Sequence, residues 1–327
     1  MPLTQAPTRL AVVTPVYNDW ESFRHLLTEL DTVAGALGGA RVDVIAVDDG
    51  STADFEPGRF RGLELQSLGN VSVLHLACNL GHQRAIAIGL SEVDALARYD
   101  AAIVMDCDGE DRPRDIARLL DAAERHPGQI VVAQRARRSE GKGFRGVYVL
   151  YKAQFQLLTG KRISFGNFSV IPGERVARLV CTPEIWNNLA AAIARSRIPI
   201  CHCPTDRGVR YAGASSMNLV GLIIHGLSAV SVYSDIAFTR ALAFSAGLAL
   251  LTVAGIASVF AIRLFTDLAI PGWASYMVGF LVVVLMQSLM MSAGAVFLLL
   301  NNRSMPSIIP RRMLPEYVRD RTTLLER

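Results

Sequence analysis

Two long uncharged segments constrain this chain more than any other feature. Ala241–Ile262 and Trp273–Leu300 contain no Asp, Glu, Lys or Arg, and only a short link separates them. About 20 consecutive apolar residues are enough to cross the hydrocarbon core of a bilayer, which is about 30 Å thick. The two segments therefore predict a transmembrane helical hairpin. The alternative for each segment is a helix buried in a soluble core.

The charges that flank these segments predict an orientation. Arg240 precedes the first segment and three arginines follow the second, whereas the link holds one arginine and one aspartate. Positive charge accumulates on the cytoplasmic side of membrane proteins. The first residues also lack the apolar core of a signal peptide. We therefore expect a protein of the inner (cytoplasmic) membrane, with the soluble part and both termini in the cytoplasm.

The composition changes sharply along the chain. Hydrophobic residues make up 51% of the whole, but the excess lies after residue 217. We expect a soluble domain over 1–212, a juxtamembrane helix over 213–236, the hairpin over 237–302 and a cytoplasmic tail over 303–327. Met217–Asp235 has only a moderate amphipathic pattern, so it predicts a helix at the membrane surface or a third buried helix.

Charge and cysteine content exclude some classes of function. A net charge of +4 is too small to indicate nucleic-acid binding. Basic clusters such as that at Arg135 and Arg137 suit phosphates, an anionic membrane surface, or simply solvent. The five cysteines are irregularly spaced, which argues against a disulfide framework. Cys201–Cys203 lacks the second ligand pair of a zinc site.

The N-terminal half alternates between predicted strands and helices. Helical spacing of apolar residues follows Trp20, and Asp115–Glu124 is also predicted to be helical. This alternation predicts a mostly parallel sheet with helices on both faces. The expected strands are Arg9–Val16, Val42–Val47, Val71–Leu76, Ala101–Met105 and Ile130–Ala133.

Polar clusters follow three of these strands. The sequences TPVYND, DDGS and DCDGED stand where the first, second and fourth strands end. Ligands bind at the carboxyl ends of the strands in such sheets. Crowded carboxylates keep their charge only beside a cation or strong donors, and Mg²⁺ and Mn²⁺ prefer oxygen ligands and bridge to phosphates. We expect Asp108, with Asp106 nearby, to bind a divalent cation, and Asp48 and Asp49 to bind a base or ribose.

The ordered set of motifs resembles a known family. TPVYND, VDDGS, NLGHQRAIAIG and MDCDGED are similar to segments of the family 2 glycosyltransferases, which have a GT-A fold, a Rossmann-like α/β architecture. The resemblance is narrower still to the polyprenyl-phosphate glycosyltransferases, the group of dolichol-phosphate mannose synthase and bactoprenol glucosyltransferase. The segments RYAGASSM before the hairpin and LPEYVRD after it extend the resemblance over almost the whole chain.

The resemblance implies a role for particular residues. Asp106 and Asp108 would bind the metal and the diphosphate, and would be catalytic together with Arg210. The implied nucleotide-sugar site contains Pro15, Tyr17, Asp19, Asp48, Asp49, Gln83 and Asp106. The implied site for the acceptor phosphate contains Arg135, Arg137, Arg210 and Ser215, although the arginines also fit an ordinary charged surface.

The implied reaction is an inverting sugar transfer that depends on Mg²⁺ or Mn²⁺. The donor would be a nucleotide diphosphate sugar, with UDP-glucose favoured, and the acceptor undecaprenyl phosphate or another polyprenyl phosphate. The chain departs from the family pattern at Glu110, Asn167 and Ser216. Asn167 cannot act as a general base, but a lipid monophosphate is already largely dianionic at neutral pH.

Two other functions stay open on the sequence. One is a family 2 glycosyltransferase with a different lipid or glycan acceptor. The other is a membrane-tethered nucleotide-sugar binding protein whose catalysis is weakened. Small residues at Ser292–Gly294 also suit close packing between copies of the hairpin, so a homo-oligomer is possible.

Overall fold

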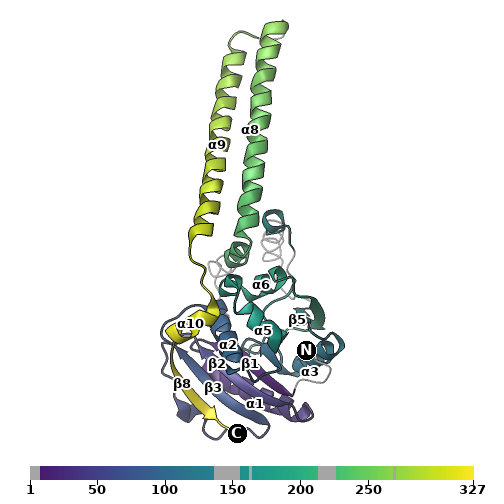
Figure 1. Ribbon diagram of the computed structural model, residues 1–327, viewed down its shortest axis with the longest axis vertical. Helices are drawn as coiled ribbons and strands as arrows, with labels where there is room; N and C mark the ends of the chain where they lie inside the picture. Colours follow the sequence, from purple (N-terminus) through teal and green to yellow (C-terminus); the bar gives the residue numbers. More distant parts are fainter. Residues whose placement is uncertain (1–7, 136–154, 162–163, 213–225, 268–269) are drawn as a thin grey trace. The chain divides into compact units, whose positions relative to one another are not determined.

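The computed structural model describes residues 8–135, 155–161, 164–212, 226–267 and 270–327. The chain divides into two compact units. The first contains Met1–Tyr148, Ile163–Val232 and Ser307–Arg327, and the second contains Val149–Arg162 and Tyr233–Pro306. The first unit is built on a β-sheet and the second on two long helices, α8 (Ser234–Phe265) and α9 (Trp273–Ser304) (Figure 1).

The sheet of the first unit has eight strands in the order β7-β5-β6-β4-β1-β2-β3-β8. Only β6 and β8 run against their neighbours, so the sheet is mixed but mostly parallel. This confirms the predicted α/β fold class with a mostly parallel sheet. The strands are β1 (Arg9–Val16), β2 (Arg41–Asp48), β3 (Leu68–Leu76), β4 (Ala101–Val104), β5 (Ile130–Arg135), β6 (Ser169–Pro172), β7 (Ile200–Thr205) and β8 (Val318–Leu325).

Helices cover both faces of this sheet because successive strand residues point to opposite sides. In β1, Leu10 and Val12 pack into the same core as α1 and α3. Ala11 and Val13 pack into a second core with α2, α5, α6 and α10. The helices are α1 (Trp20–Ala36), α2 (His82–Leu96), α3 (Ile116–Arg125), α5 (Gly173–Leu179), α6 (Leu189–Arg195) and α10 (Pro310–Tyr317), with short 3₁₀ helices at Pro57–Phe60, Pro113–Asp115 and Pro183–Trp186.

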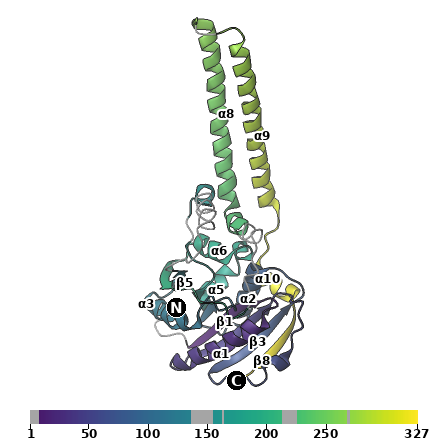
Figure 2. The same ribbon diagram turned by 180° about the vertical axis from the view of Figure 1, so that it is seen from behind.

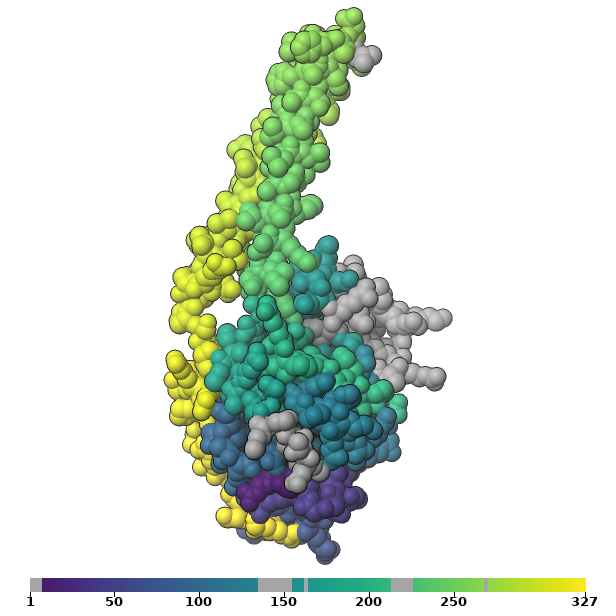
Figure 3. Space-filling view, turned by 45° about the vertical axis from the view of Figure 1, so that its right-hand side comes forward, coloured from purple at the N-terminus to yellow at the C-terminus, as the bar shows by residue number. Residues whose placement is uncertain are grey.

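The C-terminal segment belongs to the first unit. Residues after 307 form α10, which packs on α2, and β8, which pairs antiparallel with β3. Figure 2 shows β8 beside β3 from the opposite side, and in Figure 3 the yellow C-terminal segment borders the blue and purple N-terminal part. The sequence predicted a cytoplasmic C-terminal tail over 303–327, and the structure places α10 and β8 within that segment.

The second unit consists of α8 (Ser234–Phe265) and α9 (Trp273–Ser304). Both helices are long and apolar enough to cross a membrane, and most of their side chains are exposed. They touch along residues repeated every seven positions on α8, namely Ser245, Thr252 and Val259. The hydroxyls of Ser245 and Ser292 lie 2.7 Å apart across this contact. Of the juxtamembrane helix predicted over 213–236, residues 226–231 are helical and 213–225 lie outside the described residues.

Candidate functional site

The three polar clusters singled out in the sequence meet at one edge of the sheet. β1 pairs with β2 and with β4 in parallel, with Val16 opposite Asp48 and Val13 opposite Val104. The segments that follow these strands therefore leave the sheet side by side. They carry Tyr17 and Asp19 after β1, Asp49 after β2, and the acidic loop after β4.

The acidic loop that follows β4 is held by its own carboxylates. Asp108 Oδ1 accepts a hydrogen bond from the Glu110 N–H (2.9 Å), and Asp111 Oδ2 accepts one from the Asp106 N–H (3.1 Å). Gly109 turns the loop with φ of +88°, a conformation that favours glycine. Burial raises the pKa of Asp108, partly against the Glu110 hydrogen bond. The folded protein by itself therefore disfavours the charged form of the Asp108 carboxyl group.

A second segment, 206–211, lies directly against the acidic loop. The Tyr211 N–H donates to the Asp108 carbonyl (2.9 Å) and the Gly208 N–H to the Glu110 carbonyl (2.8 Å). Arg207 also pairs with the Glu110 carboxylate at 2.6 Å. The approach is so close that a side chain at Gly208 would overlap the Gly109 carbonyl oxygen. The two backbone bonds hold the segment between Gly208 and Tyr211, which contains Arg210.

Arg210 lies between carboxylates from two different strand ends. Its Nη2 is 3.4 Å from Asp108 Oδ2 and 3.9 Å from Asp19 Oδ2. Its Nε is buried and has no hydrogen-bond partner in the part of the chain that the structure describes. A buried donor of this kind normally binds an acceptor. Arg210 thus offers an N–H to a ligand oxygen beside Asp108.

Asp48 and Asp49 are both buried and both bonded within the protein. Asp48 accepts from the Ser51 N–H (3.0 Å) and from His75 Nδ1 (2.9 Å). Asp49 accepts from the backbone N–H groups of Leu80 and Gly81. Burial acts to raise the pKa of Asp48, but the bonds from His75 and Ser51 outweigh it and lower that pKa, whereas burial raises the pKa of Asp49. Both side chains shape the turn after β2, and their contact with a base or ribose stays a prediction.

The backbone of the turn after β2 leaves no room for a side chain at Gly50. Its φ is +65°, and an added Cβ would lie 2.6 Å from the Cys78 carbonyl carbon and the Asn79 nitrogen. We expect Gly50→Ala to destabilise the protein by more than the 1–2 kcal/mol that left-handed backbone costs an L residue. Gly38→Ala is the control, because Gly38 has a similar φ of +62° with no atom within 4 Å of its Cβ position. Denaturant unfolding of both variants measures the difference; equal losses would contradict the predicted clash.

A row of side chains connects α6 to the acidic loop. The Leu189 N–H donates to Gln83 Oε1 (2.8 Å), and Gln83 Nε2 donates to Asn167 Oδ1 (3.2 Å). Asn167 Nδ2 lies 3.0 Å from His82 Nε2, which lies 3.1 Å from Asp106 Oδ1. Burial lowers the pKa of His82, but the Asp106 carboxylate outweighs it and raises that pKa. The predicted Gln83 thus reaches Asp106 through Asn167 and His82.

His82 lies in the candidate site beside Asp106, but the sequence did not predict this. It opens α2 directly after the glycine of NLGHQ, and that place at a helix start was the only local signal. Among the other predicted residues, Pro15 lies in β1 opposite Val47 and Tyr17 is 49% exposed at the same edge. Arg135 ends β5. Arg137, Ser215 and Ser216 lie outside the described residues.

Comparisons with known proteins give several relatives. The chain is 34% identical over 123 residues to an undecaprenyl-phosphate 4-deoxy-4-formamido-L-arabinose transferase of Klebsiella pneumoniae (strain 342), which covers 37% of this chain and 36% of that protein. The chain thus spans about a third of the length of such relatives. It is 27% identical over 243 residues to the uncharacterized glycosyltransferase YkoT of Bacillus subtilis (strain 168). The match covers 71% of this chain and 69% of that protein.

Among solved structures, similarity extends to glucosyl-3-phosphoglycerate synthase from Mycobacterium tuberculosis in complex with Mn²⁺, UDP-glucose and phosphoglyceric acid. The identity is 16% and the TM-score 0.48, over 72% of this chain and 81% of that one. The sequence profile of glycosyl transferase family 2 matches residues 11–178, just over half of the chain. That range contains all but the first two residues of β1, the strands β2 to β6, and the acidic loop. The chain therefore belongs to glycosyl transferase family 2.

Proposed function

We propose that this protein is a glycosyltransferase that moves a sugar from a nucleotide diphosphate sugar to a polyprenyl phosphate at the cytoplasmic face of the inner membrane. UDP-glucose is the favoured donor and undecaprenyl phosphate the favoured acceptor. The observation that carries the proposal is the cluster of Asp108, Asp106 and Arg210 at the strand edge. The names of relatives from Klebsiella pneumoniae and Erwinia tasmaniensis, which state transfer to undecaprenyl phosphate, support the choice of acceptor.

The donor atoms at the edge fit a divalent cation that is shared with a substrate. In the described residues, no three His, Cys, Asp or Glu side chains form a metal site by themselves. Mg²⁺ is typically bound by one or two carboxylates, several waters and substrate phosphates. Asp108 and Asp106 would supply these carboxylates. When bound, Mg²⁺ or Mn²⁺ neutralises negative charge on the diphosphate.

Arg210 would bind phosphate oxygens beside that diphosphate. Its guanidinium already lies near Asp108 and Asp19, and its Nε points to no protein acceptor in the described part of the chain. Arginine binds phosphate through a planar, permanently charged group with several donors. In the proposed reaction it holds the acceptor phosphate where one of its oxygens faces the anomeric carbon.

The acceptor needs positioning more than deprotonation. A phosphate monoester has a second pKa of about 6 and is largely dianionic at neutral pH. Its oxygen attacks the anomeric carbon, the bond from that carbon to the nucleotide diphosphate breaks, and the configuration inverts. Asn167 lies in the row of polar contacts that ends at Asp106, where a carboxylate would add negative charge. An amide at this position is therefore compatible with catalysis.

The two long helices support a membrane location for this reaction. α8 and α9 are each 32 residues long and largely exposed, so a bilayer is the solvent that fits them. We propose that they form a transmembrane hairpin with both termini cytoplasmic. The polyprenyl chain of the acceptor would then stay in the membrane while its phosphate reaches the soluble unit.

Arg210→Gln tests the proposed phosphate contact. We expect kcat/KM for the lipid phosphate to fall about a hundredfold, since a hydrogen bond to a charged group contributes roughly 1.5–3 kcal/mol. Arg207→Gln is the control, because Arg207 pairs with Glu110 at the exposed rim. Initial rates over a range of acceptor concentrations measure the effect. Equal losses in the two variants would argue against a specific role for Arg210.

The function itself is tested by sugar transfer with the full-length protein in detergent. The assay contains undecaprenyl phosphate, a panel of UDP- and GDP-sugars, and Mg²⁺ or Mn²⁺, with a chelated control. A labelled lipid product that needs the metal supports the proposal and identifies the sugar. Transfer to a different lipid or to a glycan, with no product on polyprenyl phosphate, would overturn the proposed acceptor.

A further inference from the structure

The C-terminal strand reaches the site edge through a buried histidine. β8 pairs with β3, placing Asp320 opposite His75. His75 Nε2 lies 3.0 Å from the hydroxyl of Thr322 in β8, and His75 Nδ1 lies 2.9 Å from Asp48 Oδ2. His75 and Asp48 are only 5% and 7% exposed. A continuous row of polar contacts therefore runs from the last strand of the chain to the turn after β2.

The direction of the hydrogen bonds in this row follows from the chemistry of the groups. The Asp48 carboxylate only accepts, so His75 Nδ1 carries the proton that it donates. In the neutral ring, Nε2 is then an acceptor, and the Thr322 hydroxyl can rotate to donate to it. Removing this hydroxyl would leave a buried ring nitrogen unsatisfied, which is costly. Asp48 thus sets the tautomer of His75, and Thr322 helps to fix the orientation of the ring.

The position of Asp48 in turn determines the shape of the site edge. Its second oxygen accepts from the Ser51 N–H, which closes the turn that contains Asp49 and Gly50. The ring of Phe55 packs on His75 with its centroid 4.9 Å away, so the histidine has little room to move alone. A shift of His75 would therefore pass to Asp48 and to the Asp48–Ser51 turn.

We propose that β8 is part of the donor site, with Thr322 and His75 as positioning residues that hold Asp48 and the Asp48–Ser51 turn in the shape that binds the nucleotide. The inference rests on the proposed function in one respect, that a nucleotide diphosphate sugar binds at this edge. Linkage is reciprocal, so a nucleotide that prefers the ordered turn also stabilises the docked strand. Donor binding and docking of the C-terminal strand are one coupled event.

The test measures the affinity of UDP and of the donor UDP-sugar for the full-length protein in detergent by calorimetry. Thr322→Val keeps the shape of the side chain but removes the hydroxyl, and we expect the affinity to fall about fivefold to tenfold. Thr322→Ser restores a hydroxyl and should bind within about twofold of wild type. At saturating donor, kcat should change less than the donor KM, since neither residue touches the reacting atoms.

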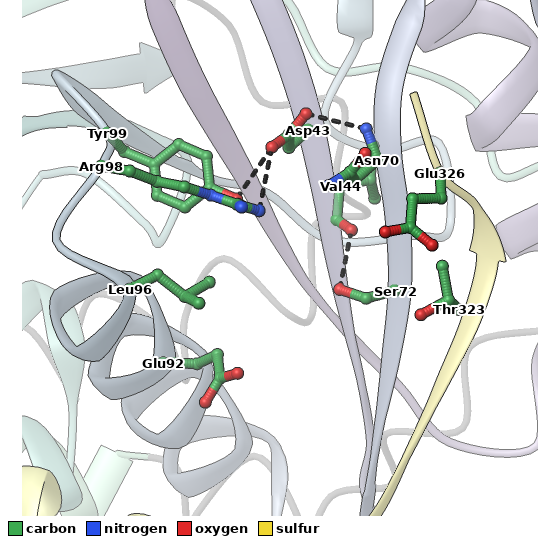
Figure 4. Close-up of a pocket in the computed structure, with 10 residues that line it drawn as sticks. All are labelled: Asp43, Val44, Asn70, Ser72, Glu92, Leu96, Arg98, Tyr99, Thr323 and Glu326. Carbon is green, nitrogen blue, oxygen red and sulfur yellow. Dashed lines mark hydrogen bonds and ion pairs between the residues drawn. The ribbon is translucent and has the colours of Figure 1, made fainter.

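Thr323→Val is the matched control in the same strand. Thr323 lines a different cavity of about 150 Å³, whose walls include Glu92 and Leu96 of α2 (Figure 4). We expect this variant to bind UDP as the wild type does. A Thr323→Val loss as large as that of Thr322→Val would assign the effect to general weakening of β8 and overturn the proposal.

Hydrogen exchange supplies a second readout that does not depend on turnover. Saturating UDP should slow exchange of β8 amides in the wild type, and the slowing should shrink in Thr322→Val. Unchanged UDP affinity in a folded Thr322→Val variant, or no effect of UDP on β8 exchange, would overturn the inference. If the wild type binds no nucleotide at all, the proposed function fails instead, so the two failures are distinguishable.

Discussion

Asp108→Asn is expected to reduce sugar transfer by about a thousandfold or more while the protein stays folded. The loss follows from the proposed role of Asp108 at the diphosphate, because electrostatic stabilisation of this kind contributes several kcal/mol and each 1.36 kcal/mol is a factor of ten in rate. An asparagine Oδ1 can still accept the Glu110 N–H that holds the acidic loop. Initial rates with the best donor measure the loss of sugar transfer. Electron paramagnetic resonance measures whether the variant still binds Mn²⁺.

Stability should not fall with this change. Burial raises the pKa of Asp108, which means that the folded protein disfavours its charged form. A neutral amide removes that penalty, so we expect Asp108→Asn to unfold at the same or a slightly higher temperature. A variant that is inactive because it is unfolded is thereby separated from one that has lost only its chemistry.

Glu110→Gln is the control for the acidic loop. Glu110 lies two residues away and pairs with Arg207 at 2.6 Å, so its charge is used at the rim of the site. We expect a loss of transfer smaller than tenfold. If Asp108→Asn keeps more than a tenth of the wild-type rate, or if both variants lose activity equally, Asp108 does not have the special role assigned to it.

The parts of the fold that the sequence predicted well are those with strong local patterns. Arg9–Val16 was predicted with its exact bounds, because this apolar run lies in the centre of the sheet with both of its faces buried. The convergence of the polar clusters followed from a rule about parallel sheets. The two long helices followed from length and lack of charge, and both extend beyond the predicted segments because polar flanks continue the helix.

The parts that were missed depend on contacts distant in sequence. β6 has four residues, too few for a periodic signal. β8 reads VRDRTTLL, and its charged and polar side chains are mostly exposed. It becomes a strand because β3 offers an unpaired edge about 250 positions earlier. His75 and His82 likewise look ordinary in the sequence and acquire a role only where the fold brings Asp48 and Asp106 beside them.

Deletion of Val318–Arg327 is expected to destabilise the first unit by roughly 3–5 kcal/mol, from lost apolar burial at Leu324 and Leu325 and from lost hydrogen bonds. Glu92, 8% exposed, loses its partner Arg321, and His75 loses Thr322. The β3 edge then presents unpaired backbone groups, which promotes association between molecules. Hydrogen exchange of β3 amides and the temperature of aggregation in detergent measure the outcome.

A shorter deletion distinguishes the contribution of β8 from that of the two residues that follow it. Removing only Glu326 and Arg327 leaves β8 intact but removes the bonds from Arg327 to the carbonyls of Leu65 and Gln66. We expect this variant to keep the slow exchange of the β3 amides, because the ladder between β3 and β8 persists. Slow exchange of β3 in the longer deletion as well would mean that β8 adds little to the sheet. β8 follows the two long helices in the chain, so the eight-stranded sheet is complete only when residues after the hairpin pair with β3.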